Sequence, residues 1–178
     1  MNKKIHYPAI ILSLCLCSLA GLAQQLAPGI AWQKSLGGSG DDQANSIVKT
    51  VDGGFIIAGT SKSNDGDVTG HHGSIDSTDA WVVKLSSSGS IQWQKSIGGS
   101  GVDELDQIIP TNDGNFVAIG HTSSNDGDVS GNHGDWDIWV VKIDRNGNIL
   151  WQKCLGGSLR DKAASIRQTI DKIGRAHV

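Results

Sequence analysis

The octapeptide Trp-Gln-Lys-Ser-Leu-Gly-Gly-Ser at residues 32–39 reveals how this sequence is organised, because it occurs three times. Residues 93–100 and 151–158 repeat it with one substitution each. From Trp32 to Trp93 the period is 61 residues, and from Trp93 to Trp151 it is 58. A period of this size indicates a protein built from stacked structural repeats.

The segments between the octapeptides also agree. The first two copies share the motifs Asp-Gly-(Gly/Asn)-Phe, Ser-Asn-Asp-Gly-Asp-Val and Trp-Val-Val-Lys, which start at residues 52, 63 and 81 and again at residues 113, 124 and 139. The shorter second period reflects a deletion in the polar loop before the third motif, where changes of length are tolerated. The sequence therefore contains two complete copies of one repeat unit and the beginning of a third copy.

Each unit is predicted to contain four short strands, which in the first copy span residues 46–50, 55–60, 80–85 and 91–97. Asp-Gly between two apolar segments is a strong hairpin signal. The segments Phe-Ile-Ile-Ala and Trp-Val-Val are apolar without alternation, which is typical of strands buried on both faces. Four-stranded sheets whose two faces are both covered are the blades of a propeller.

We therefore predict an all-β fold: a partial β-propeller of four-stranded antiparallel blades, with two complete blades plus partial ones. A β-solenoid is the alternative, but solenoid repeats are usually shorter and lack two hairpins per unit. The composition agrees with a turn-rich β protein, since the 178 residues include 24 Gly and only 2 Phe.

The N-terminal residues predict export. Lys3 and Lys4 precede an apolar run that ends in Gly21-Leu22-Ala23, the small-x-small pattern of a signal-peptide cleavage site. The run is too short to span a bilayer comfortably, so an integral membrane protein is not expected. We expect a secreted or cell-surface protein. Without Lys3 and Lys4 the chain has 13 Lys and Arg and 18 Asp and Glu, which is a net charge of −5. This acidic charge disfavours nucleic acid as a partner.

The motif set resembles a known family. Trp-x-x-x-x-Gly-Gly-Ser-x-x-Asp from residue 32, Asp-Gly-Gly-Phe-Ile-Ile-Ala-Gly from residue 52 and Trp-Val-Val-Lys from residue 81 are similar to motifs of bacterial β-propeller repeat proteins. Many relatives with the stretch found here at residues 124–134 are large secreted or surface proteins that carry a C-terminal type IX sorting domain. The resemblance covers Trp32 to about Asp171, and it implies the fold and export more strongly than a function.

The repeat and the resemblance divide the chain into six predicted segments. They are a signal peptide (1–23), an N-terminal closing strand and linker (24–44), blade 1 to its junction with blade 2 (45–105), blade 2 and the start of blade 3 (106–163), a truncated third blade (164–172) and a C-terminal hexapeptide (173–178). The hexapeptide Ile-Gly-Arg-Ala-His-Val replaces the expected apolar strand, and a widely used sequencing adapter encodes it immediately before a stop codon. We expect it to be an adapter artefact, with further blades missing; a natural unstructured terminus is the alternative.

The polar loop of each unit is predicted to bind calcium. It fits the start of a calcium loop, Asp-x-Asp-x-(Ser/Thr)-Gly, followed by an Asp that can close the site. The candidate ligands are Asp65, Asp67, Thr69 and Asp76 in the first copy and Asp126, Asp128, Ser130 and Asp137 in the second. Against this, turns rich in Asn, Asp and Gly are common without metal. In addition, when the deletion in the second copy is taken into account, Asp137 aligns with Asp79 and not with Asp76, which weakens the last predicted ligand.

Other polar residues have a simpler interpretation. Three loop histidines (His71, His72 and His133) have the chemistry of zinc ligands, but solvated loop residues are the expected reading. One aspartate follows the glycine pair in each copy (Asp42, Asp103 and Asp161). It is expected to accept hydrogen bonds from backbone N–H groups of the turn, since recurrence in every copy argues against catalysis.

Two further side chains stand out. Cys154, the one cysteine after the predicted signal peptide, occupies the position of a serine in the other copies and is expected to be a small core residue. Trp136 has no counterpart in the first copy, and a carbohydrate-stacking platform is one interpretation of it. The repeated tryptophans are expected to pack between blades.

The sequence predicts a non-catalytic binding or scaffold module of an exported bacterial protein, with an unidentified glycan or protein as ligand. The alternative is an accessory propeller of a larger secreted hydrolase, whose catalytic domain would lie beyond the end of this sequence. Apart from calcium, no cofactor is expected.

Overall fold

The computed structural model describes residues 29–74 and 76–169. The predicted signal peptide (1–23) and the C-terminal hexapeptide (173–178) lie outside these residues. The chain divides into two units, residues 1–31 and 32–178, and every described strand belongs to the second unit. The described residues contain no helix that is long and apolar enough to cross a membrane.

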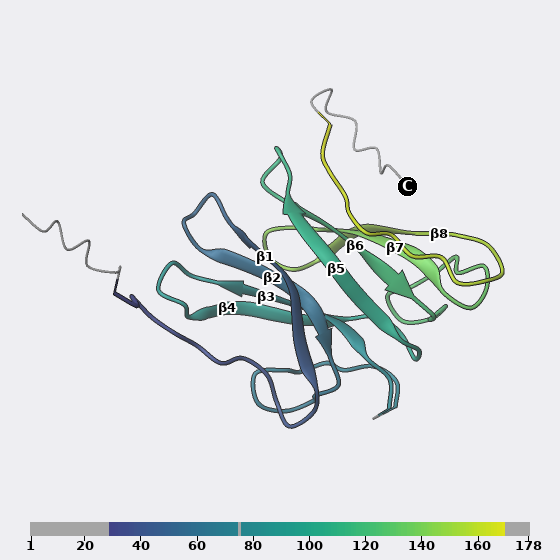
Figure 1. The fold of residues 1–178 in the computed structure, drawn as a ribbon, viewed down its shortest axis with the longest axis horizontal. Coiled ribbons are helices and arrows are strands. Elements are labelled where there is room, and N and C mark those ends of the chain that lie inside the picture. Colours follow the sequence, from purple (N-terminus) through teal and green to yellow (C-terminus); the bar gives the residue numbers. More distant parts are fainter. Residues whose placement is uncertain (1–28, 75, 170–178) are drawn as a thin grey trace, which may run out of the picture. The chain divides into compact units, whose positions relative to one another are not determined.

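The structure confirms the all-β prediction, with two four-stranded antiparallel sheets (Figure 1). Sheet 1 has the order β1-β2-β3-β4, formed by Asp42–Lys49, Phe55–Ser61, Asp79–Leu85 and Ile91–Ile97. Sheet 2 has the order β5-β6-β7-β8, formed by Asp103–Pro110, Phe116–Thr122, Asp137–Ile143 and Ile149–Leu155. Each sheet is formed by the four strands of one predicted unit, whose last strand carries the start of the next octapeptide.

The first strand of each sheet is longer than the apolar pattern indicates. β1 begins at Asp42 and not at residue 46, because Asp42, Gln43 and Ala44 pair with the end of β2 and Asn45 is the additional residue of a bulge. The register of this pair shifts between Ala44 and Ser46, and that of β5 and β6 shifts between Leu105 and Gln107. This bulge is therefore a property of the repeat.

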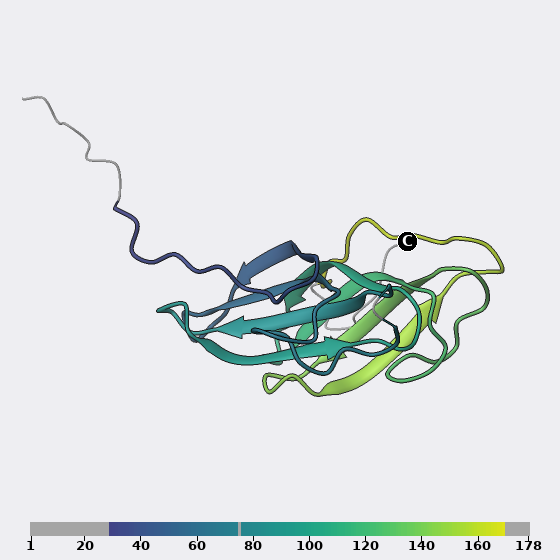
Figure 2. The same cartoon turned by 90° about the horizontal axis from the view of Figure 1, so that it is seen from below.

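The core lies between the sheets. β3 is buried along its whole length, as the apolar segment Trp81-Val82-Val83 at its centre predicts, and its charged Asp79 and Lys84 are buried too. One hydrophobic cluster joins the two sheets through residues such as Ile56 and Val82 from sheet 1 and Leu105 and Trp139 from sheet 2. The first strand of sheet 2, β5, lies against β1, β2 and β3 (Figures 1 and 2).

The junction between copies is made by the same backbone bonds each time. The N–H of Asp103 donates to the carbonyl of Thr78 at 2.8 Å, and the N–H of Asp161 donates to the carbonyl of Trp136 at 2.7 Å. The chain from Asp161 onward is not a strand within the described residues. Nevertheless, Ile166 packs against Ile119, Ile138 and Val140 of sheet 2. The third copy therefore begins to cover sheet 2 as sheet 2 covers sheet 1.

The repeated tryptophans also join copies. The indole N–H of Trp93 donates to the carbonyl of Arg145, in the hairpin between β7 and β8, at 2.9 Å. Trp32 makes the equivalent bond to Ser87, between β3 and β4, at 3.1 Å. Residues 32–38, part of the predicted closing strand, are not a strand in the structure, yet Trp32 takes the place that Trp93 takes one copy later.

Candidate functional site

The turn after each octapeptide is held by the predicted aspartate. The carboxylates of Asp42, Asp103 and Asp161 accept the backbone N–H of Gly38, Gly99 and Gly157, each at 2.7 Å. Asp103 is fully buried and also accepts the hydroxyls of Thr122 and Ser124. The predicted turn-capping role is confirmed for all three copies.

The first two carboxylates of each predicted calcium loop bind the same turn. Asp65 accepts the N–H of Ser39 and Asp126 accepts that of Ser100, both at 2.7 Å. The backbone and hydroxyl hydrogen bonds from Ser39 hold the pKa of Asp65 below its usual value. Asp67 and Asp128 face the turn too, at 3.4 and 3.3 Å from the N–H of Gly37 and of Gly98.

Of the other predicted calcium ligands, Thr69, Ser130 and Asp137 have separate partners. The hydroxyls of Thr69 and Ser130 accept amide N–H bonds from Gln94 and Gln152. Asp76 is exposed, whereas Asp137 is fully buried and accepts both the backbone N–H of His133 and a bond with its imidazole Nδ1. The structure therefore uses the loop oxygens to bind protein groups, and calcium binding stays a prediction.

Two of the loop histidines share one arrangement. The Nδ1 atom of His72 is 2.7 Å from the buried Asp79, and that of His133 is 2.6 Å from Asp137. Each pair joins the loop to the first residue of the following strand, β3 or β7. These histidines are thus bound to a carboxylate of their own copy.

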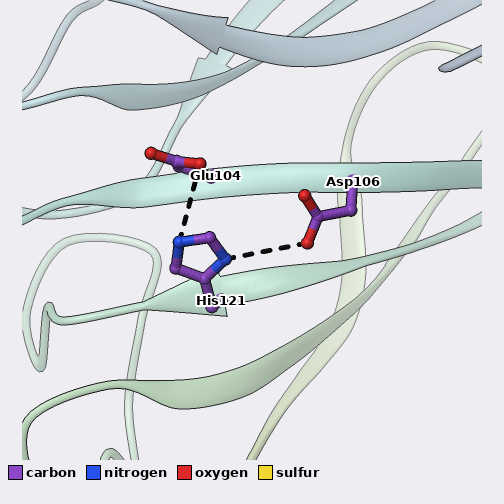
Figure 3. Close-up of side chains that lie close together, drawn as sticks. All are labelled: Glu104, Asp106 and His121. Carbon is purple, nitrogen blue, oxygen red and sulfur yellow. Dashed lines mark ion pairs between the residues drawn. The ribbon is translucent and has the colours of Figure 1, made fainter. Parts of the chain in front are cut away.

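A different group of side chains, missed in the sequence, forms the candidate site. In the described residues, the one set of three carboxylate, imidazole or thiol ligands whose atoms lie within 4.8 Å of one another is Glu104, Asp106 and His121. Glu104 Oε2 is 3.5 Å from His121 Nε2, and Asp106 Oδ2 is 3.7 Å from His121 Nδ1. Figure 3 shows the imidazole between the two carboxylates.

The backbone explains why these residues meet. Glu104 on β5 is paired directly with His121 on β6. The bulge between Leu105 and Gln107 inserts Asp106 as an additional residue, so that it also lies beside the imidazole. Leu105 points to the opposite side, where it is fully buried in the core.

The imidazole is buried and lacks hydrogen bonds. The side chain of His121 is 4 % exposed, and neither of its ring nitrogens has a hydrogen-bond partner. Distances of 3.5 and 3.7 Å to the carboxylates are too long for such bonds. The carboxylate side chains are 31 % and 37 % exposed, so the cluster is open to solvent on their side.

Trp136 adjoins this cluster. Its indole stacks on His121, with ring centroids 4.6 Å apart and planes at 20°. The guanidinium of Arg160 and the ammonium of Lys162 each lie 4.5 Å from the centre of the indole. Because protein groups already stack on this ring, the structure does not favour the interpretation of Trp136 as an open platform for a sugar.

The site is particular to the second copy. The positions of Glu104, Asp106 and His121 are occupied in sheet 1 by Gln43, Asn45 and Thr60, in the same register and beside the same bulge. The junction bond places Trp136 where the first copy has Thr78. A comparison of the two copies position by position would have found this cluster in the sequence, since two neutral amides are replaced by two carboxylates opposite a new histidine.

Cys154 is buried, as predicted, and is a free thiol. Burial, together with the nearby Asp137 and Asp103 carboxylates, raises the pKa of this thiol to about 11. It is therefore protonated and unreactive at neutral pH.

Comparison with known proteins does not add to this picture. The chain matches no model of a protein family, and it matches no curated protein.

Proposed function

We propose that the chain is part of a non-catalytic binding or scaffold module of an exported bacterial protein, built as consecutive blades of a β-propeller. The observation that carries this proposal is the repeated junction, in which the bond from Asp103 to Thr78 recurs one copy later as the bond from Asp161 to Trp136. A junction that recurs without change generates a regular stack of sheets.

The pairing of strands favours a propeller over a solenoid. In a solenoid, neighbouring repeats contribute strands to shared sheets. Here the ladders of both sheets join strands of one copy, and the sheets meet through side chains. Sheets packed face to face in this way are the arrangement of propeller blades.

An open face agrees with further blades. Trp93 is partly covered by the following hairpin, whereas Trp151, at the same position of the repeat, is 46 % exposed. A third complete blade would bring its own hairpin over Trp151. The resemblance of the motifs to those of bacterial propeller repeats and the predicted signal peptide support export.

A structure of the complete gene product tests this architecture. We expect successive four-stranded sheets around one axis, each joined to the preceding sheet by an aspartate N–H bonded to a loop carbonyl. Strands of neighbouring copies paired into continuous sheets would contradict the proposal.

Assays of the purified complete protein with fluorogenic glycoside and peptide substrates test its non-catalytic character. We expect no turnover above that of the buffer. Turnover that follows the protein through purification would instead favour the hydrolase alternative.

A further inference from the structure

We propose that Glu104, Asp106 and His121 form a binding site for a divalent first-row transition-metal ion, with zinc as the reference ion. This inference concerns the second sheet alone, and it does not depend on the propeller arrangement.

The first step in the argument is the condition of His121. A buried imidazole normally finds partners for both ring nitrogens, since an unpaired buried polar group is costly. His121 has none, although its side chain is 4 % exposed. An ion bound to one ring nitrogen would remove that unpaired lone pair.

The second step is the spacing of the ligand atoms. Two atoms bound to one zinc ion at about 2.0–2.2 Å with a tetrahedral angle are about 3.4 Å apart. Glu104 Oε2 is 3.5 Å from the imidazole, and one atom each from Glu104, Asp106 and His121 lie within 4.8 Å of one another. Glu104 lies beside Nε2 of His121 and Asp106 beside Nδ1, so one of these partly exposed carboxylates has to turn toward the ring nitrogen that holds the ion.

The third step is the chemistry of the ligands. One imidazole and two carboxylates suit zinc, manganese or iron(II), whereas calcium and magnesium prefer oxygen ligands alone. Two carboxylates also balance the charge of a divalent ion. Three protein ligands leave a further coordination position, on the carboxylate side that is open to solvent, for water or a ligand oxygen.

The surroundings orient the histidine. Trp136 stacks on the imidazole and limits the rotation of the ring. Of the two cations near the indole, Arg160 is already paired with Asp135, at 2.8 Å. The first copy offers a natural comparison, because Gln43, Asn45 and Thr60 stand on the same backbone without the charges or the imidazole.

Calorimetric titration of the full chain with zinc chloride tests the site. The protein is purified without a polyhistidine tag and freed of metal with a chelator. We expect one site tighter than any other zinc binding by the chain. The triple variant Glu104→Gln, Asp106→Asn, His121→Thr carries the residues of the first copy, and we expect it to bind zinc at least about tenfold more weakly.

Two controls make the result specific. The double variant His72→Asn, His133→Asn removes the two loop histidines that are bonded to a carboxylate and should retain the tight site. The single variant Glu104→Gln changes a partly exposed side chain and is expected to fold. It should bind zinc more weakly than the wild type, and it replaces the triple variant in the test if that variant fails to fold. Far-ultraviolet circular dichroism of each variant checks the fold.

Three results would overturn the proposal. The first is that the wild-type chain binds no zinc, in which case the imidazole is held between two carboxylates as an internal ion-pair network. The second is that the folded triple variant, or Glu104→Gln if the triple variant does not fold, binds as tightly as the wild type. The third is that the loop-histidine variant alone loses the site.

Discussion

The imidazole of His121 stacks on the indole of Trp136, with 4.6 Å between the ring centroids and 20° between the ring planes. This contact joins β6 to the loop that leads into β7, next to the point where the third copy begins. Neither residue has an equivalent in sheet 1, where Thr60 and Thr78 take these positions. The two aromatic rings therefore belong to a feature added to one copy of an otherwise regular repeat.

Replacing Trp136 by the residue of the first copy should destabilise the second sheet. Trp136→Thr removes the stacked pair and the ring beside Arg160 and Lys162, and we expect a loss of about 1–2 kcal/mol in the free energy of unfolding. Trp136→Phe keeps a flat ring and should lose less. Urea denaturation measures both, and equal stability of Trp136→Thr and the wild type would show that the stack does not contribute.

The two tryptophans Trp93 and Trp151 occupy the same position of the repeat but should respond differently to truncation. Trp93→Ala removes a packed indole and its bond to Arg145, for an expected loss of about 2–3 kcal/mol. Trp151 is 46 % exposed, so Trp151→Ala should change stability by about 0.5 kcal/mol or less. Urea denaturation compares the two, and similar losses would contradict a role for Trp93 in joining the sheets.

A chelator distinguishes calcium binding by the predicted loops from the hydrogen bonds that the same loops make to the turn. Asp126→Asn should lower the melting temperature even with a chelator present, because the charged acceptor of the Ser100 N–H is lost. Calcium binding adds a different expectation, a rise in the melting temperature of the wild type at millimolar calcium that Asp128→Asn reduces. An unchanged melting temperature at millimolar calcium would contradict calcium binding by these loops.

The pair of Asp52 and Lys84 should make stability dependent on pH in the acid range. The hydroxyl of Thr50, followed by the Lys84 ammonium, lowers the pKa of Asp52 from its usual 3.8. Because the pKa is lower in the folded state, this carboxylate stabilises the fold at pH values above the pKa of the unfolded chain. That contribution to the free energy of unfolding is lost as the pH falls toward the pKa of the folded state.

Asp52→Asn should therefore be less stable than the wild type at pH 6, and the difference should shrink below pH 3.8. Asp113→Asn is the matched comparison, because Asp113 has a lowered pKa of the same origin but pairs with Lys142, which is 21 % exposed while Lys84 is 6 % exposed. We expect the same pH dependence and a smaller loss of stability. Urea denaturation at several pH values measures both. A difference that grows as the pH falls would contradict the assignment.

The sequence predicted strands well where side chains are buried. The predicted strand over residues 91–97 agrees with β4, and β3 differs by one residue at its start. The beginning of β1 was missed because Gln43 and Asn45 are exposed and carry no apolar signal. Gln43 lies in the sheet through its backbone pairing with Thr60, and Asn45 is the additional residue of a bulge that disrupts the alternation there.

The candidate site was missed for a related reason. Each of Glu104, Asp106 and His121 is unremarkable as a single polar residue, and they become a group through strand pairing that no local motif records. The calcium interpretation relied on such a local motif, yet the structure shows Asp65 and Asp126 bound to backbone N–H groups of the turn. Trp136 was noticed because the copies were compared at that point, and the same comparison would have identified the cluster beside it.

Crystals grown with zinc allow the site to be located without assumptions, by comparing anomalous difference maps recorded above and below the zinc absorption edge. We expect the strongest zinc peak at about 2.0–2.2 Å from one ring nitrogen of His121 and from carboxylate oxygens of Glu104 and Asp106. A map with no peak there, or with zinc only at His72, His133 or the Asp65 and Asp126 loops, would contradict the metal site.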